Sequence, residues 1–244
     1  GGEATHATEE ILTTLLTEMD GFVSDPKRPV LVIAATNYDV SDSGTKRALD
    51  PALLRRFDRR ILVGLPDTED RKAFLEYYLK KHGLRGISAD AIVNIAARTP
   101  GESPAKLESM VEYAIRKKKG GEVTDADLAE AVDAVNYGAE RTWSESAVRK
   151  TAVHEAGHAL VSWLTGTVPE YLTVVSRGGH GGYMMPAVNE DKFDHTRGEL
   201  LDNICVRMGG RAAEQAVYGE DGVTTGASSD LMGARRLVIA MACE

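Results

Sequence analysis

Apolar residues near the start of the chain form one periodic segment and two short continuous runs. Those between residues 11 and 19 recur every three or four positions, which places them on one face of a helix. Two short apolar runs, residues 30–35 and 60–63, are typical of buried strands, and a short helix is expected between them at residues 51–54. Helix, strand, helix and strand in this order predict part of an α/β layer.

A helical period begins at residue 68. Four helices are expected in succession, at residues 68–83, 89–97, 105–116 and 125–135. Ser103 before Pro104 and Thr124 before Asp125 are typical of helix starts. Four short helices in a row predict a small all-α domain.

The rest of the chain predicts another, mainly helical domain. It begins after residues 137–143, a stretch of Gly, Glu and Arg that is typical of a linker. Helices are expected at residues 144–164, 200–209 and 211–218, and short strands at residues 172–175 and 183–185. The predicted domains are therefore residues 1–67, 68–138 and 142–244.

Composition excludes several classes of protein. The chain has 244 residues, 43% hydrophobic and 27% charged, which is ordinary for a globular protein, and its net charge of −8 argues against nucleic-acid binding. The two cysteines form no CxxC pair, so a disulfide framework is not expected. No apolar run reaches the roughly 18 residues of a membrane span. We expect the chain to be soluble and to be part of a longer protein, because it stops within a predicted helix.

Candidate chemistry is concentrated in the predicted helix at residues 144–164. His154 and His158 are four positions apart, so they share one face of that helix and both imidazoles can bind one zinc ion. Glu155 stands beside the first histidine, where it can accept a proton from the attacking water and pass it to the leaving amine. The pattern His-Glu-x-x-His predicts a zinc metalloprotease.

A third zinc ligand has to come from elsewhere in the chain, because a catalytic zinc usually takes three protein ligands. Spacing alone leaves six candidates open: Asp230, Glu214, Glu220, Asp221, His180 and His195. The two histidines lie in loop-like sequence, which makes them weaker candidates than the acids.

Six segments of the chain resemble the FtsH family of AAA+ zinc proteases. They are LLTEMDGF (15–22), VIAATN (32–37), LDPALLRRFDRRILVGLPD (49–67), TAVHEAGHAL (151–160), GGRAAEQ (209–215) and TTGASSDL (224–231). The resemblance implies an α/β AAA+ part at residues 1–67, an all-α lid at residues 68–138 and a mainly α-helical zinc peptidase domain at residues 142–244.

The resemblance also implies roles for individual residues. Asp230 matches the third zinc ligand, and Glu214 matches a nearby acid that supports the site. Asn37 matches the sensor that positions the water near the γ-phosphate of ATP. Arg56 and Arg59 match the arginine fingers that reach the ATP of a neighbouring subunit, a task that suits guanidinium because it stays charged and forks onto phosphate oxygens.

The chain departs from the family pattern around its nucleotide-related segments. Leu54-Arg55-Arg56 lacks the usual Pro-Gly, which affects the expected geometry of the fingers, and residues 101–106 replace the family's GxSGAD. The chain contains no G-x-x-x-x-G-K-[ST] loop, and the acidic Walker B strand is expected before residue 1. ATP with magnesium is therefore expected to bind only to a longer protein.

The sequence thus predicts an ATP-dependent zinc metalloendopeptidase that unfolds and degrades protein substrates. The family implies a homo-hexamer, anchored by membrane segments absent here, on the cytoplasmic face of a membrane. Residues 171–175 alternate like an edge strand that could hold an extended substrate, although an ordinary hairpin strand explains the pattern equally well. The alternative is a AAA+ remodelling chaperone with a non-catalytic peptidase module, and the intact residues 154–158 and Asp230 argue against it.

Overall fold

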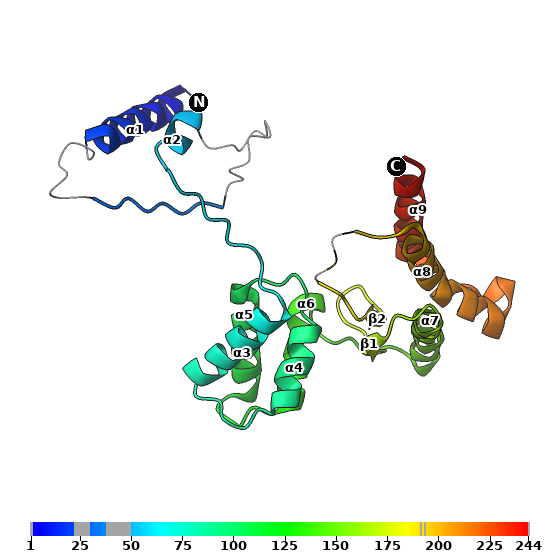
Figure 1. Cartoon of the computed structure of the whole chain (residues 1–244). Coiled ribbons are helices and arrows are strands. Elements are labelled where there is room, and N and C mark those ends of the chain that lie inside the picture. The colour runs from blue at the N-terminus through cyan, green and yellow to red at the C-terminus, as the bar shows by residue number, and fades with distance from the viewer. Residues whose placement is uncertain (1, 22–29, 38–49, 191, 193, 244) are drawn as a thin grey trace. The chain divides into compact units, whose positions relative to one another are not determined.

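The computed structural model describes residues 2–21, 30–37, 50–190, 192 and 194–243, with side chains described from residue 10 onward (Figure 1). The chain divides into two compact units, Gly1–Gly64 and Leu65–Glu244. None of the described helices is long and apolar enough to cross a membrane.

The first unit contains two described helices, α1 (Gly2–Gly21) and α2 (Pro51–Leu54). Asp50 caps α2 by accepting a hydrogen bond from the backbone N–H of Ala52 at 2.7 Å, and Pro51 opens the helix. Arg56 follows α2 and forms a two-pronged contact with Asp20 at the end of α1, with N···O distances of 2.8 and 2.6 Å. This ion pair joins the two helices of the unit.

The prediction of two strands in the first unit is wrong for the residues that the structure describes there. Residues 30–36 and 59–64 contain no strand, and their apolar side chains face solvent: Leu31 is 82% exposed and Leu62 is 89% exposed. An apolar strand becomes buried only when neighbouring strands pair with it and helices cover the sheet. No described segment of the unit pairs with either run, so the expected α/β layer is not formed there.

Four helices open the second unit: α3 (Thr68–Lys81), α4 (Ala89–Ala97), α5 (Pro104–Lys118) and α6 (Asp125–Tyr137). Each begins at a side-chain cap, provided in order by Asp67, Ser88, Ser103 and Thr124. They surround one apolar core centred on Leu75, Leu107, Met110, Leu128 and Val132. These helices, called the α3–α6 bundle below, lie close to the predicted positions, whereas their role as a lid remains a prediction.

The rest of the second unit is mainly helical, and its one described hairpin lies beside α7 (Figure 1). Its elements are α7 (Glu145–Leu164), β1 (Pro169–Thr173), β2 (Tyr183–Pro186), α8 (Arg197–Tyr218), the 3₁₀ turns η2 (Glu220–Gly222) and η3 (Thr225–Ala227), and α9 (Ser228–Cys243). The strands β1 and β2 are antiparallel, with Leu172 opposite Met184 and Thr173 opposite Tyr183. The strand predicted at residues 172–175 is therefore displaced, since β1 begins at residue 169 and ends at residue 173.

The helix α8 replaces the two helices predicted at residues 200–209 and 211–218. Gly209 and Gly210 looked like a break, because glycine weakens a helix by about 1 kcal/mol relative to alanine. In the structure they lie inside α8, where the helix passes very close to α7. A Cβ atom on Gly157 would lie 2.3 Å from the Gly209 carbonyl oxygen, and one on Gly209 would lie 2.6 Å from the Gly157 carbonyl oxygen. The glycines therefore allow backbone-to-backbone contact between the two helices.

We predict that Gly157→Ala destabilises the second unit although alanine is the better helix former. Alanine favours the helix by about 1 kcal/mol over glycine. Its methyl group would collide with the backbone of Gly209, and overpacking of this kind costs more, about 1–3 kcal/mol or above. Urea unfolding followed by the fluorescence of Trp143 and Trp163 should show a lower midpoint. The matched control is Gly198→Ala in the first turn of α8, where the nearest atom to the new Cβ is 3.8 Å away. Equal midpoints for the two variants would contradict the prediction.

Candidate metal centre

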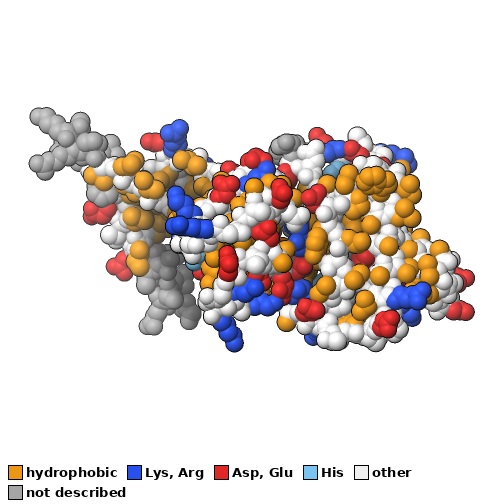
Figure 2. Space-filling model, turned by 90° about the horizontal axis from the view of Figure 1, so that it is seen from below, with side chains coloured by type: hydrophobic (Ala, Val, Ile, Leu, Met, Phe, Trp, Pro, Cys, Tyr) orange, Lys and Arg blue, Asp and Glu red, His pale blue; other side chains and the backbone are white. Residues whose placement is uncertain are grey.

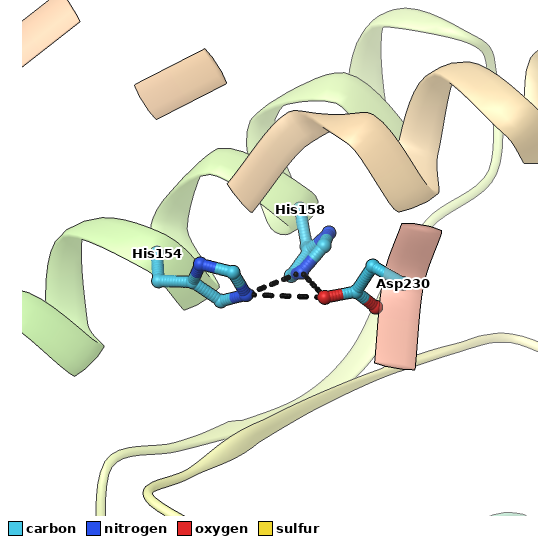
Figure 3. A group of neighbouring side chains, drawn as sticks. All are labelled: His154, His158 and Asp230. Atoms are coloured by element: carbon cyan, nitrogen blue, oxygen red, sulfur yellow. Dashed lines mark hydrogen bonds and ion pairs between the residues drawn. The ribbon is translucent and has the colours of Figure 1, made fainter. Parts of the chain in front are cut away.

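The helix α7 presents both predicted histidines to the interior of the second unit. Ser144 caps the helix by accepting from the backbone N–H of Ala147 at 3.3 Å, and the helix then runs unbroken to Leu164. His154 and His158 lie one turn apart, and both are buried. Their imidazole Nε2 atoms are 3.0 Å from each other (Figure 3).

Asp230 completes a triangle with the two histidines. It lies in the first turn of α9, and its Oδ2 is 3.3 Å from His154 Nε2 and 3.5 Å from His158 Nε2 (Figure 3). A tetrahedral zinc with bonds of about 2.0–2.1 Å would hold its ligand atoms about 3.3 Å apart. The three atoms therefore have the spacing that one zinc ion requires.

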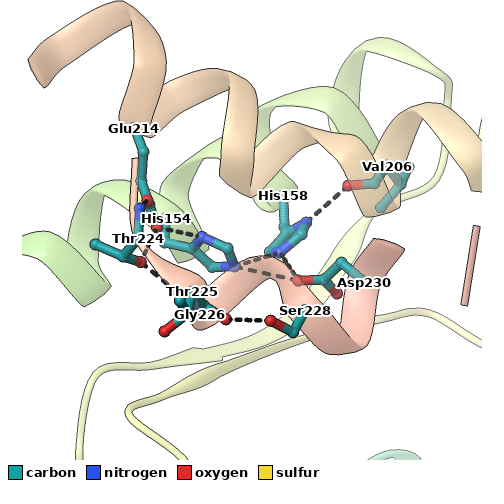
Figure 4. A network of polar contacts seen from close by, with 9 residues as sticks. All are labelled: His154, His158, Val206, Glu214, Thr224, Thr225, Gly226, Ser228 and Asp230. Carbon is teal, nitrogen blue, oxygen red and sulfur yellow. Dashed lines mark hydrogen bonds and ion pairs between the residues drawn. The ribbon is translucent and has the colours of Figure 1, made fainter. Parts of the chain in front are cut away.

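Hydrogen bonds on the outer side of each ring determine which nitrogen is free to bind a metal. His158 Nδ1 lies 2.7 Å from the carbonyl oxygen of Val206, and His154 Nδ1 lies 2.7 Å from Glu214 Oε1 (Figure 4). A carbonyl and a carboxylate only accept, so each Nδ1 carries a proton and donates it. Both Nε2 lone pairs then point toward each other, an arrangement that requires a positive charge between them.

The charges of the three groups favour a cation at this point. Burial alone would raise the pKa of Asp230, but its contacts with His154 and His158 outweigh burial and hold that pKa well below its usual range. The contact of its ring with the Asp230 carboxylate is the main reason that the pKa of His154 is raised. The pKa of His158 is also raised, because its contacts with Asp230 and Val206 outweigh the effect of burial. The site thus attracts positive charge.

Glu214 connects His154 to the segment that carries Asp230. Its side chain is buried, and besides His154 it accepts hydrogen bonds from Thr224, from the backbone N–H at 2.6 Å and from Oγ1 at 3.1 Å (Figure 4). Thr224 Oγ1 also accepts from the backbone N–H of Gly226, and Ser228 Oγ donates to the Thr225 carbonyl at 2.6 Å. These bonds order residues 224–228, which lead directly into the turn of Asp230.

Glu155 lies beside the triangle without being part of it. Burial raises the pKa of its carboxyl, and the nearby histidines oppose that shift. A hydrogen bond from the backbone of Met184 in β2 also favours the charged form. The carboxyl opens into a cleft of about 900 Å³, whose lining includes His154, His158, Met184 and Asp230. Glu155 therefore has the position of a proton-transfer group.

The other candidate ligands lie away from the two Nε2 atoms. Both oxygens of Glu214 are engaged by His154 and Thr224. Glu220, Asp221 and His195 are exposed, and the ring of His180 packs edge-on against Tyr137. Among the described residues, the structure thus brings Asp230 alone of the six candidates to the histidine pair.

A second group of possible ligands lies in the α3–α6 bundle. It consists of His82, Glu108 and Glu112. Glu108 is already paired with Lys81 at 2.6 Å, and that ammonium lowers the pKa of the carboxyl. A lysine at this distance competes with a metal ion, so this group is the weaker candidate.

The three predicted nucleotide-related residues belong to the first unit. Asn37 and Arg59 are exposed, and Arg56 is paired with Asp20. The pair raises the pKa of Arg56, chiefly through the hydrogen bond with Asp20.

Sequence reasoning missed three contributors to the metal centre. Val206 acts through its carbonyl and Met184 through its backbone, so neither side chain gave a signal. Gly210 lies against both rings, and a Cβ there would be 2.6 Å from the Nε2 atoms of His154 and His158. The Gly-Gly pair inside a helical pattern was the one available signal of this close approach.

Two segments of the chain match models of known protein families. Residues 141–244 match the model of peptidase family M41, and residues 1–65 match that of the ATPase family associated with various cellular activities (AAA). The chain is 44% identical over 244 residues to the ATP-dependent zinc metalloprotease FtsH 3 of Sphaerobacter thermophilus, covering 96% of this chain and 47% of that protein.

Two further relatives have the same name and a similar degree of identity. The chain is 42% identical to the ATP-dependent zinc metalloprotease FtsH of Akkermansia muciniphila and 39% identical to that of Mesomycoplasma conjunctivae, in each case over 97% of this chain. It spans 29% and 31% of their lengths, and less than half the length of all three relatives. The chain therefore belongs to the FtsH family, with an AAA segment at residues 1–65 and an M41 peptidase segment at residues 141–244.

Proposed function

We propose that this chain is the proteolytic part of an ATP-dependent zinc metalloendopeptidase. The observation that carries the proposal is the triangle of His154 Nε2, His158 Nε2 and Asp230 Oδ2, with both imidazoles oriented by their Nδ1 hydrogen bonds and Glu155 beside them. His154, His158 and Asp230 would hold zinc, which when bound supplies Lewis acidity toward water and the scissile carbonyl.

Glu155 would carry out both proton transfers of the reaction. Glu155 accepts a proton from the attacking water and delivers it to the leaving nitrogen, so it needs to be ionised before the reaction and neutral during it. Its burial supports the neutral form, and the Met184 backbone and the two histidines support the charged form. These opposed influences suit a group that exchanges a proton in each cycle.

We propose that an extended peptide binds along β1. Within the described residues β1 pairs with β2 on one edge only, so its other edge has backbone groups available to a further strand. Main-chain hydrogen bonding of this kind is largely independent of sequence, as a protease of unfolded chains requires.

The AAA segment supports a role of ATP, with magnesium, in delivering protein substrates to this cleft. We propose Asn37 as the sensor of the γ-phosphate and Arg56 and Arg59 as fingers toward a neighbouring subunit, with residues 68–138 as the lid. A contact with neighbouring subunits, which we propose belong to a homo-hexamer, would cover the apolar side chains that gather on one face of the second unit (orange, right of Figure 2). The end of α7 alone exposes Leu160, Trp163 and Leu164 by 60–73%.

The full-length protein would reach the cytoplasmic face of a membrane through segments outside this chain, and nucleic acid is not an expected partner. A remodelling chaperone with a non-catalytic peptidase module is the alternative. The intact His-Glu-x-x-His segment and the ordered triangle favour the protease over it.

We predict that Asp230→Ala weakens zinc binding by about 100-fold or more, because it removes one of the three ligands. Substitutions of residues that only support the ligands typically weaken metal binding by about 10–100-fold. Zinc per chain would be measured after dialysis against a competing chelator. Asp221→Ala, at an exposed acid in η2, is the matched control and should retain zinc. Equal zinc content in both variants would remove Asp230 from the ligand set.

Glu155→Gln should leave zinc binding intact and lower peptide hydrolysis by the full-length protein by about 10²–10⁴-fold, the usual contribution of a general acid–base group. The control is Glu145→Gln, at an exposed position in the first turn of the same helix. Hydrolysis at the control rate would show that Glu155 does not transfer the proton.

The Arg56 prediction separates a finger from a structural ion pair. If Arg56 reaches a neighbouring ATP, Arg56→Ala in the full-length protein should lower ATPase turnover by about 10³-fold. Asp20→Asn removes the ion-pair partner seen here and should have a much smaller effect. Equal losses in the two variants would indicate that Arg56 acts only by holding α1 against α2.

A further inference from the structure

A buried carboxylate of the α3–α6 bundle, Asp133, accepts hydrogen bonds from a tyrosine hydroxyl on each strand of the hairpin. Asp133 on α6 accepts from Tyr183 of β2 at 2.7 Å and from Tyr171 of β1 at 3.0 Å, and it is paired with Arg98 at the end of α4. The Arg98 guanidinium also lies 3.5 Å from the centre of the Tyr171 ring. Asp133 is 5% exposed and Arg98 is 2% exposed, so these contacts are shielded from water.

A second contact holds the chain just beyond β2. Glu190 lies four residues after the end of the strand, and it accepts from Arg71 Nη1 at 2.6 Å and from Thr68 Oγ1 at 2.7 Å, both on α3. Arg71 is 1% exposed and is itself held by the carbonyl oxygens of Ala96 and Pro66. The bundle is thus hydrogen-bonded to both ends of the segment from residue 183 to residue 190.

Met184 lies between these two contacts, and its backbone bonds to Glu155. The preceding turn is pressed against α7: a Cβ on Gly182 would lie 2.4 Å from the Thr173 carbonyl oxygen and 3.0 Å from Thr151 Cγ2. Thr151 is one turn before Glu155 on α7. The start of β2 therefore has α7 on one side and the bundle on the other, so a shift of the bundle moves the Met184 backbone relative to Glu155.

We propose that Asp133, through Tyr183, and Arg71, through Glu190, are positioning residues for Glu155: they hold the β2 backbone where it orients the Glu155 carboxylate. The assignment rests on the proposed proteolytic function, which gives Glu155 its role. A buried charge pair often adds little stability compared with an apolar pair of the same size, whereas in some proteins buried polar groups determine one geometry.

The test combines amide hydrogen exchange with kinetics on the zinc-loaded full-length protein. Tyr183→Phe removes the hydroxyl donor, and Glu190→Gln replaces one acceptor oxygen with an amide donor and removes the charge; both keep the shape of the side chain. Loss of such a bond costs about 0.5–1.5 kcal/mol, so exchange in residues 183–185 should become about 2- to 10-fold faster. Exchange in α5 and α8 should not change, and zinc content should equal that of the wild type.

For a short unstructured peptide, kcat should fall by about 10-fold or more with little change in KM, because only the orientation of the proton-transfer group is altered. The matched controls are Tyr77→Phe and Glu76→Gln, the same substitutions at exposed positions on α3. Unchanged exchange in residues 183–185, or faster exchange spread equally over α5 and α8, would overturn the proposal. Failure of the wild type to cleave peptide would count against the proposed function instead, and the exchange result would still decide this inference.

Discussion

The backbone contact between α7 and α8 at Gly157 and Gly209 is the constraint on which the metal centre depends. Side chains of any size would separate the two helices, since the added Cβ atoms would lie 2.3–2.6 Å from carbonyl oxygens. At the observed separation Gly210 covers the two imidazoles, and α8 brings Val206 and Glu214 to their Nδ1 atoms. Helix packing therefore decides the tautomer of each histidine, and with it the direction of each metal-binding lone pair.

Asp230 reaches the centre through a chain of polar contacts that begins at the same helix. Glu214 on α8 accepts hydrogen bonds from Thr224. The ordered residues that follow Thr224 lead into α9, which begins at Ser228. One buried carboxylate thus orients a histidine and places the segment that carries the third candidate ligand. The hairpin adds Met184 beside Glu155, and the α3–α6 bundle holds that hairpin through Asp133 and Glu190. The helix α8 thus supports both histidines and the segment of Asp230, whereas β2 supports Glu155.

Local patterns predicted the helices well and the strands poorly. The four caps at Asp67, Ser88, Ser103 and Thr124 begin helices close to where apolar periodicity placed them, because capping and periodicity act within one or two turns. Residues 30–35 and 60–63 have strand-like composition, yet they are exposed and unpaired with any described strand. A strand depends on partners elsewhere in the chain, which its own residues do not specify.

The sequence by itself determined the chemistry of the histidine pair, since four residues of separation on a helix place His154 and His158 on one face and Glu155 beside them. It left six candidates for a third ligand until the FtsH resemblance indicated Asp230. Only the tertiary structure brought Asp230 within 3.5 Å of both Nε2 atoms, placed Glu214 Oε1 at 2.7 Å from His154 Nδ1, and joined α8 through Gly209 and Gly210. These outcomes depend on how closely two helices pack, a distance that no local pattern of residues contains.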